Sequence, residues 1–114
     1  MTTASPQHDL IVFGATSFVG KILARELLEQ FGTHGNLDWA AAGRSLARLE
    51  ELRASLGPQA ARLPLVVADA GDEATLRQMC LGTRAVVSTV GPYALYGETL
   101  VKVCAATGPD YCDL

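Results

Sequence analysis

Short apolar runs alternate with amphipathic segments along the chain. In four runs the apolar residues are nearly consecutive, which is typical of strands buried on both faces of a parallel sheet. Each of these runs ends at, or directly before, a glycine or an aspartate, and a fifth strand is expected at the C-terminal residues. The expected strands are residues 10–14, 37–42, 63–68, 85–90 and 110–114.

Helical patterns fill the intervals between these strands. The first has four large apolar residues at i, i+4 spacing, which predicts the inner face of a helix. These residues are Val19, Leu23, Leu27 and Phe31. Ser45 and Asp72 are of the residue types that cap helix N-termini, and each precedes a segment with apolar residues at helical spacing. Further helices are expected over residues 46–56, 73–81 and 98–106.

The order of these elements predicts an α/β fold with a doubly wound parallel sheet. Consecutive parallel strands joined by helices cross over with a right-handed sense, so the expected strand order is 3-2-1-4-5. Residues 1–8 are expected to form a flexible polar tail and residues 9–114 one domain. No helix follows the fifth strand to cover that edge. The chain is therefore interpreted as a truncated N-terminal domain of a longer protein, or as a domain whose edge a partner covers.

Composition narrows the classes of function. Of the 114 residues, 49% are hydrophobic and 18% charged, so the chain has enough apolar surface for a core. The net charge is −3 and aromatic residues make up 6%, which argues against a nucleic-acid-binding surface. The three cysteines form no C-x-x-C pair, so reduced thiols are expected rather than a metal site. The N-terminus lacks the pattern of a signal peptide, and a cytoplasmic location is expected.

The loop after the first strand predicts a phosphate-binding turn. It resembles the glycine-rich fingerprint of Rossmann-like folds, in which a strand turns sharply into a helix whose N–H groups hold a pyrophosphate. Ser17 stands where that fingerprint usually has a glycine, and its hydroxyl is a candidate donor to phosphate. A tight turn that binds no ligand is the alternative. The candidate residues are Gly14, Thr16, Ser17, Phe18, Val19 and Gly20.

The end of the second strand indicates which dinucleotide is bound. NAD-binding domains of this kind carry an acidic residue there for the ribose hydroxyls, whereas this chain has Gly43, Arg44 and Ser45. A guanidinium forms two parallel hydrogen bonds to a phosphate, and Ser45 adds a hydroxyl. The pattern therefore favours NADP(H). An arginine that is merely exposed after a strand is the alternative.

Two further strand ends carry candidate cofactor contacts. Asp69 and Ala70 follow the third strand, where the carboxylate could accept from an adenine amino group or serve only in a turn. The fourth strand ends beside the first at the switch point of the sheet, where the nicotinamide ribose is expected. Its candidate residues are Val90, Gly91, Pro92 and Tyr93. Tyr93 and Tyr96 either line the nicotinamide side or simply pack. No residue pattern identifies a catalytic acid, a nucleophile or a metal site.

Three segments together resemble one family. They are the first loop, the Ala42–Ser45 segment, and the stretch from Val87 through Gly91-Pro92-Tyr93 to Asp110-Tyr-Cys-Asp. The sequence resembles the N-terminal NADP-binding domain of saccharopine dehydrogenase-like oxidoreductases, including the trans-acting enoyl reductases of mycobacterial lipid synthesis. The resemblance covers nearly the whole chain from Asp9.

The resemblance implies hydride transfer between NADP(H) and a carbonyl, imine or enoyl substrate in a longer protein. It also implies that the C-terminal substrate domain is absent from this chain, that the isolated chain is inactive, and that the full-length protein can associate with a membrane. The edge of strand 110–114 offers a surface for a homo-oligomer. Two other readings stay open: a non-catalytic dinucleotide sensor, and a packed α/β module without a ligand.

Overall fold

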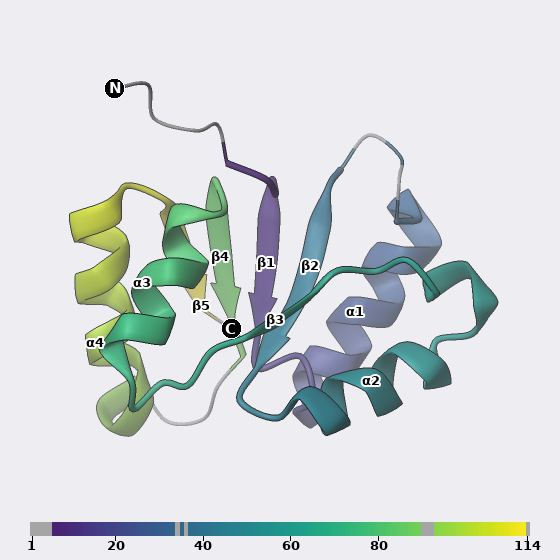
Figure 1. Cartoon of the computed structure of the whole chain (residues 1–114), viewed down its shortest axis with the longest axis horizontal. Helices are drawn as coiled ribbons and strands as arrows, with labels where there is room; N and C mark the ends of the chain where they lie inside the picture. The colour runs from purple at the N-terminus through teal and green to yellow at the C-terminus, as the bar shows by residue number, and fades with distance from the viewer. Residues whose placement is uncertain (1–5, 34, 36, 90–92, 114) are drawn as a thin grey trace.

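The computed structural model describes residues 6–33, 35, 37–89 and 93–113, with the side chains of 93–97 and 113 excepted. Its five strands are β1 (Leu10–Phe13), β2 (Trp39–Gly43), β3 (Leu65–Val67), β4 (Ala85–Ser88) and β5 (Asp110–Asp113). Its helices are α1 (Phe18–Phe31), α2 (Leu46–Ser55), the short 3-10 helix η1 (Pro58–Ala60), α3 (Glu73–Leu81) and α4 (Tyr93–Thr107). Strands and helices alternate along the chain, as Figure 1 shows.

All five strands form one parallel sheet in the order β3-β2-β1-β4-β5. The predicted fold class and strand order are confirmed. In the centre, Ile11 of β1 pairs with Ala40 of β2 on one side and with Val86 of β4 on the other. The switch point therefore lies between β1 and β4, at the end where both strands finish.

Two layers of helices enclose the sheet. In Figure 1, α1 and α2 lie on one face and α3 and α4 on the other. Val12 of β1 packs into the core beneath α1 and α2, whereas Ile11 and Phe13 point into the core beneath α3 and α4. Because neighbouring residues of a strand face opposite ways, burial on both faces explains why β1 reads as an unbroken apolar run.

The inner face of α1 differs from the prediction. The buried residues of this helix are Gly20, Ala24, Leu27 and Leu28. Of the four predicted residues only Leu27 is buried, while Val19 is 45% exposed and Phe31 41% exposed. The reason is the closeness of α1 to β1, since only small residues fit at the point of contact. A Cβ on Gly20 would lie 2.8 Å from Cα of Ala15 and closer still to the carbonyl oxygen of Gly14.

Several boundaries also move. β2 begins two residues later than predicted, β3 spans only Leu65–Val67, and β4 ends at Ser88. α4 begins at Tyr93 rather than at residue 98 and runs through Gly97, a residue that costs roughly 1 kcal/mol within a helix. At the N-terminal end, His8 forms a parallel bridge with Thr83, so the chain joins the sheet one residue before the predicted domain start.

Candidate functional site

The turn between β1 and α1 is held by backbone hydrogen bonds and by glycine. Gly14 has φ of 85°, a conformation that side chains other than glycine rarely adopt. The N–H groups of Gly14 and Ala15 both donate to the carbonyl of Ala42 in β2, and Ser17 N–H donates to Gly14. The turn is therefore anchored to the neighbouring strand before the helix begins.

Ser17 is the N-cap of α1. Its Oγ accepts a hydrogen bond from the N–H of Gly20 at 3.0 Å, and it lies 3.1 Å from the hydroxyl of Thr89. Thr89 Oγ1 in turn lies 2.8 Å from the carbonyl oxygen of Gly14, an acceptor only. The carbonyl oxygen of Phe13 lies 3.1 Å from the same hydroxyl, so Thr89 donates its single proton to these backbone carbonyls, and Ser17 donates its own proton to Thr89. Ser17 thus helps to lock the turn, and direct donation from Ser17 to phosphate stays a prediction.

Three backbone donors remain at this helix start. Within the described part of the chain, the N–H groups of Thr16, Phe18 and Val19 have no hydrogen-bond acceptor. Helix N-termini combine such donors with the positive end of the helix dipole, which favours an anion. A pyrophosphate fits these donors, and both the glycine turn and the Ser17 cap hold the donors in place.

A second helix begins at the same edge of the sheet. Ser45 caps α2, as predicted, and its Oγ accepts from the N–H of Arg48 at 3.3 Å. Arg44 directly precedes this cap and is exposed. The chain that leaves β2 thus brings a guanidinium, a hydroxyl and a helix N-terminus to the end of the sheet that also carries the β1–α1 turn.

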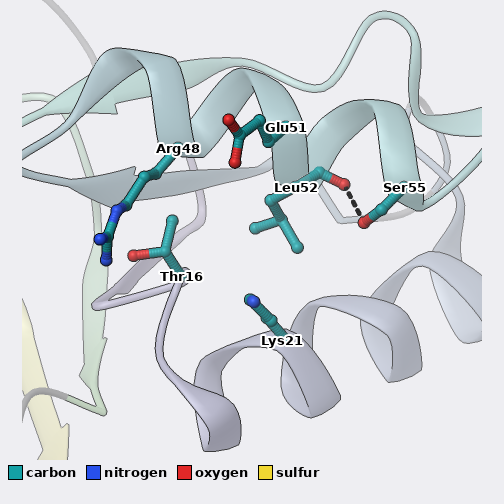
Figure 2. Close-up of a pocket in the computed structure, with 6 residues that line it drawn as sticks. All are labelled: Thr16, Lys21, Arg48, Glu51, Leu52 and Ser55. Carbon is teal, nitrogen blue, oxygen red and sulfur yellow. Dashed lines mark hydrogen bonds between the residues drawn. The ribbon is translucent and has the colours of Figure 1, made fainter.

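A cleft of about 410 Å³ lies between α1 and α2, next to the turn. Its lining residues are Thr16, Lys21, Arg48, Glu51, Leu52 and Ser55. Figure 2 shows Lys21 on the α1 wall and Arg48 on the α2 wall, and Thr16 of the turn lines the same cleft. The ion pairs found among the described residues are Arg84 with Asp9 and Lys102 with Glu73, so neither cation of the cleft is neutralised by one.

Lys21 and Arg48 are the residues that sequence reasoning missed. Arg48 lies in the first turn of α2, three residues after the Ser45 cap, and a cation so close to the predicted cap is a signal that was available. Lys21 comes directly after Gly20, so the sequence alone also predicts that it lies close to the β1–α1 turn. Which wall each would occupy depends on how α1 and α2 pack, and that only the structure shows.

Asp69 lies in a turn after β3. Its Oδ1 accepts from the N–H of Gly71 at 2.9 Å, and its backbone N–H donates to the hydroxyl of Thr75. Ala70, half-buried, packs against the core beneath α3 and α4. Of the two roles that the sequence allows for Asp69, the structure displays the turn, and the contact with adenine stays a prediction.

The fourth strand end is only partly described. Val90, Gly91 and Pro92 lie outside the described residues, as does the side chain of Tyr93, whose backbone begins α4. The residue before them, Thr89, donates its N–H to the carbonyl of Phe13 at 2.9 Å. Thr89 therefore lies directly beside the β1–α1 turn, and the role of Val90, Gly91, Pro92 and Tyr93 toward the nicotinamide stays a prediction.

No group of three or more His, Cys, Asp or Glu residues that could hold a metal ion occurs in the described ranges. Nor is any helix there long and apolar enough to cross a membrane.

Comparisons with known proteins agree with this geometry. The sequence model of the saccharopine dehydrogenase NADP binding domain matches residues 10–114. A trans-acting enoyl reductase of Mycobacterium tuberculosis is 44% identical over 114 residues, which are 100% of this chain and 27% of that protein. The trans-acting enoyl reductase of Mycobacterium leprae is 45% identical, with the same coverage. The chain thus spans about a quarter of the length of these curated relatives.

Solved structures share the fold. Saccharopine dehydrogenase (L-Glu forming) from Saccharomyces cerevisiae, in its apo form, superposes with a TM-score of 0.71 at 20% identity, over 93% of this chain and 21% of that one. The Escherichia coli quinone oxidoreductase QOR2, complexed with NADPH, gives a TM-score of 0.68 at 23% identity, over 88% and 34% of the two chains. The sequence match over nearly the whole chain decides the family: this chain belongs to the saccharopine dehydrogenase NADP-binding domains.

Proposed function

We propose that this chain binds NADP(H) and forms the cofactor-binding part of an oxidoreductase that reduces an enoyl substrate. The family of the chain is named for NADP binding, and the relatives at 44–45% identity are named trans-acting enoyl reductases. NADPH, when bound, supplies the hydride. The residues of this chain hold and orient the dinucleotide.

The cationic edge of the cleft carries the proposal. β2 ends at Gly43, and Arg44 and Ser45 follow it without a carboxylate, while Arg48 in the first turn of α2 lines the cleft. A 2′-phosphate distinguishes NADP from NAD, and two guanidinium groups beside a helix N-terminus match its charge. Facing them, the three backbone donors of the β1–α1 turn suit the pyrophosphate. Under this proposal, the site for the 2′-phosphate and the site for the pyrophosphate both adjoin Thr16.

The substrate side lies outside this chain under the proposal. The relatives are nearly four times as long as the matched region. Carbonyl and imine substrates remain alternatives to an enoyl group, because each accepts a hydride. The isolated chain is expected to bind the cofactor without catalysing a reaction. The full-length protein is proposed to act in the cytoplasm, where NADPH is available.

Calorimetric titration with NADPH and NADH tests the cofactor assignment. The wild-type chain is expected to bind NADPH more tightly, and Arg44→Ala to weaken NADPH by roughly tenfold or more with little effect on NADH. Arg62→Ala is the matched control. Arg62 is also exposed, but it precedes β3 and so lies toward the N-terminal end of the parallel strands, whereas Arg44 lies at their C-terminal end. Equal affinity of the wild-type chain for both cofactors would refute NADP selectivity. Binding without turnover by the full-length protein would favour a dinucleotide sensor instead.

Self-association through β5 is part of the proposal. β5 is the last strand of the sheet and pairs with β4 on its inner side. Edge strands are templates for pairing with another chain. Light scattering over a wide range of protein concentration is expected to show a dimer, and a constant monomer mass would exclude this part of the proposal.

A further inference from the structure

Two buried thiols face each other between α3 and α4. The sulfur atoms of Cys80 and Cys104 lie 3.6 Å apart. Cys80 is 1% exposed and Cys104 3% exposed, and both belong to the core beneath these helices. Cofactor binding as proposed above uses neither residue, and both lie on the face of the sheet away from the α1–α2 cleft.

The separation is short enough for a covalent bond between the helices. A disulfide needs a sulfur–sulfur distance of about 2.05 Å, so the two atoms must approach by about 1.6 Å. Rotation of both side chains about χ1 provides movements of this size. The partners come from two helices that already pack together.

The contact also makes the two thiols chemically unequal. The hydrogen bond from Cys104 lowers the pKa of the Cys80 thiol, and the same bond raises the pKa of Cys104. The thiolate is the reactive form of cysteine. We assign Cys80, whose pKa is lowered, as the attacking sulfur, while the formation of the bond itself depends on the 3.6 Å separation of the two sulfur atoms.

We propose that Cys80 and Cys104 form an oxidation site at which a small peroxide converts the two thiols into a reversible disulfide joining α3 to α4. The Cys80 thiolate attacks a peroxide oxygen, the O–O bond breaks, and a sulfenic acid forms with release of water. The Cys104 sulfur then attacks the Cys80 sulfur, the S–O bond breaks, and the hydroxyl leaves with the Cys104 proton as a second water. Two thiols have lost two electrons and two protons, and one hydrogen peroxide has become two waters.

The bond would restrain a functionally important part of the chain. The closed loop runs from the end of α3 through β4 to α4, and it includes the 90–92 segment that is predicted to approach the nicotinamide. Closing such a loop removes conformations mainly from the unfolded chain, so the oxidised protein should be the more stable one. For a loop of this length in a domain of this size, the expected rise in Tm is on the order of 10 °C.

The experiment uses the folded chain and hydrogen peroxide. Cys112 is exposed on β5, so its oxidation in the wild-type protein reports whether the dose of peroxide is sufficient. The variant Cys112→Ser removes this third thiol, so that the mass of the protein reports only on Cys80 and Cys104. After peroxide treatment and alkylation of the remaining thiols in denaturant, Cys112→Ser is expected to show a loss of two hydrogens and no alkylation. Peptide mapping should join Cys80 to Cys104. A rise in Tm that dithiothreitol reverses should accompany the bond.

A second variant separates the first step from the second. In Cys104→Ala/Cys112→Ser, Cys80 has no partner, and a sulfenic acid at Cys80 is expected to be trapped by dimedone. If this variant does not fold, the mass and peptide map of Cys112→Ser decide alone. The proposal is overturned if both buried thiols are alkylated in full at a peroxide dose that oxidises Cys112 in the wild-type protein. A linkage that includes Cys112 would equally overturn it.

Discussion

The hydroxyl of Ser17, at the start of α1, lies 3.1 Å from the hydroxyl of Thr89, which follows β4. The hydroxyl of Thr89 in turn donates a hydrogen bond to the carbonyl oxygen of Gly14 at 2.8 Å. Residues that are 72 positions apart thus hold the two sides of the switch point together. This contact accounts for a serine at a position where the fingerprint usually has glycine, because Ser17 supplies both the helix cap and the link to β4.

Thr89→Val is expected to destabilise the domain and to weaken NADPH binding. Valine has nearly the shape of threonine, but it removes the hydroxyl that accepts from Ser17 and donates to Gly14, and it leaves Ser17 only the longer contact of 3.5 Å to the backbone carbonyl of residue 89. The expected loss of unfolding free energy is about 1–2 kcal/mol. Urea denaturation measures the stability, and calorimetry the affinity.

Thr89→Ser is the matched control for this prediction, because serine keeps the hydroxyl and loses only a methyl group. It should retain most of the stability and the affinity. If Thr89→Val and Thr89→Ser behave alike, the hydrogen bonds across the switch point contribute little.

Gly20→Ala is expected to disturb the contact between α1 and β1. The added Cβ would press against the backbone of Gly14 and Ala15, which cannot move without distorting the turn. Overpacking of this kind costs on the order of 2 kcal/mol, more than the gain in helix propensity from glycine to alanine. Thermal unfolding checks the result.

Gly71→Ala serves as the comparison for Gly20→Ala. Gly71 is exposed, and an added Cβ would meet only the Asp69 carboxylate at 3.5 Å, an ordinary contact. Its Tm should stay close to that of the wild-type chain. Equal Tm values for the two variants would show that α1 can shift to admit a Cβ.

The fold could be predicted almost completely from the sequence because its signals are local. Apolar runs, glycine turns and the caps Ser45 and Asp72 mark the elements, and right-handed crossovers then leave few arrangements of the sheet. The face of α1 could not be read in the same way. Periodicity favoured the largest apolar residues, whereas the distance between helix and strand selected Gly20 and Ala24.

The candidate site was predictable where it depends on strand ends and less so where it depends on packing. Gly14 and Arg44 stand at the edge that parallel strands share, and their positions follow from the strand order. Thr89, Lys21 and Arg48 act across elements that are distant in sequence or through the packing of two helices. No short motif encodes such contacts, so three-dimensional structure was needed to find them.

Stability should decrease as the pH falls below the ordinary range of histidine, in part through His8. The backbone of His8 forms hydrogen bonds with Gly82 and Arg84, which hold the residue in place. Burial lowers the pKa of its ring, and the negative charges of Asp38 and Asp9 oppose this shift. The unfolded chain, with an ordinary pKa of about 6.5, therefore binds the proton before the folded chain does. The free energy of unfolding decreases until the pH passes below the lowered pKa of the folded state.

His8→Gln removes this proton-binding site without adding a charge. Between pH 7 and pH 5, the unfolding free energy of the variant should depend less on pH than that of the wild-type chain. Urea denaturation at several pH values gives both curves, and the difference between them isolates His8 from the carboxylates. Parallel curves would mean that the ring titrates alike in both states.

Arg48→Gln is expected to lower the affinity for NADPH by roughly tenfold and to leave NADH nearly unchanged. Arg48 lies on the α2 wall of the cleft that Thr16 also lines, and it forms no ion pair with any residue that the structure describes. A charge-assisted bond to a 2′-phosphate is about twice as strong as a neutral one, and glutamine removes the charge while it keeps a polar side chain, shorter than that of arginine. Calorimetry at low and moderate salt measures the effect, and the salt dependence of NADPH binding should also decrease.

The pattern across two cofactors and two variants identifies what the cleft holds. Arg62→Gln removes the same charge near the N-terminal end of the strands. It should alter neither the affinity for NADPH and NADH nor the salt dependence of binding beyond a small general effect. A selective loss of NADPH binding in Arg48→Gln places the 2′-phosphate at the mouth of the cleft beside Arg44. An equal loss for NADPH and NADH would instead indicate a group common to both cofactors, such as the pyrophosphate, and Arg44 alone would then account for any preference for NADP(H).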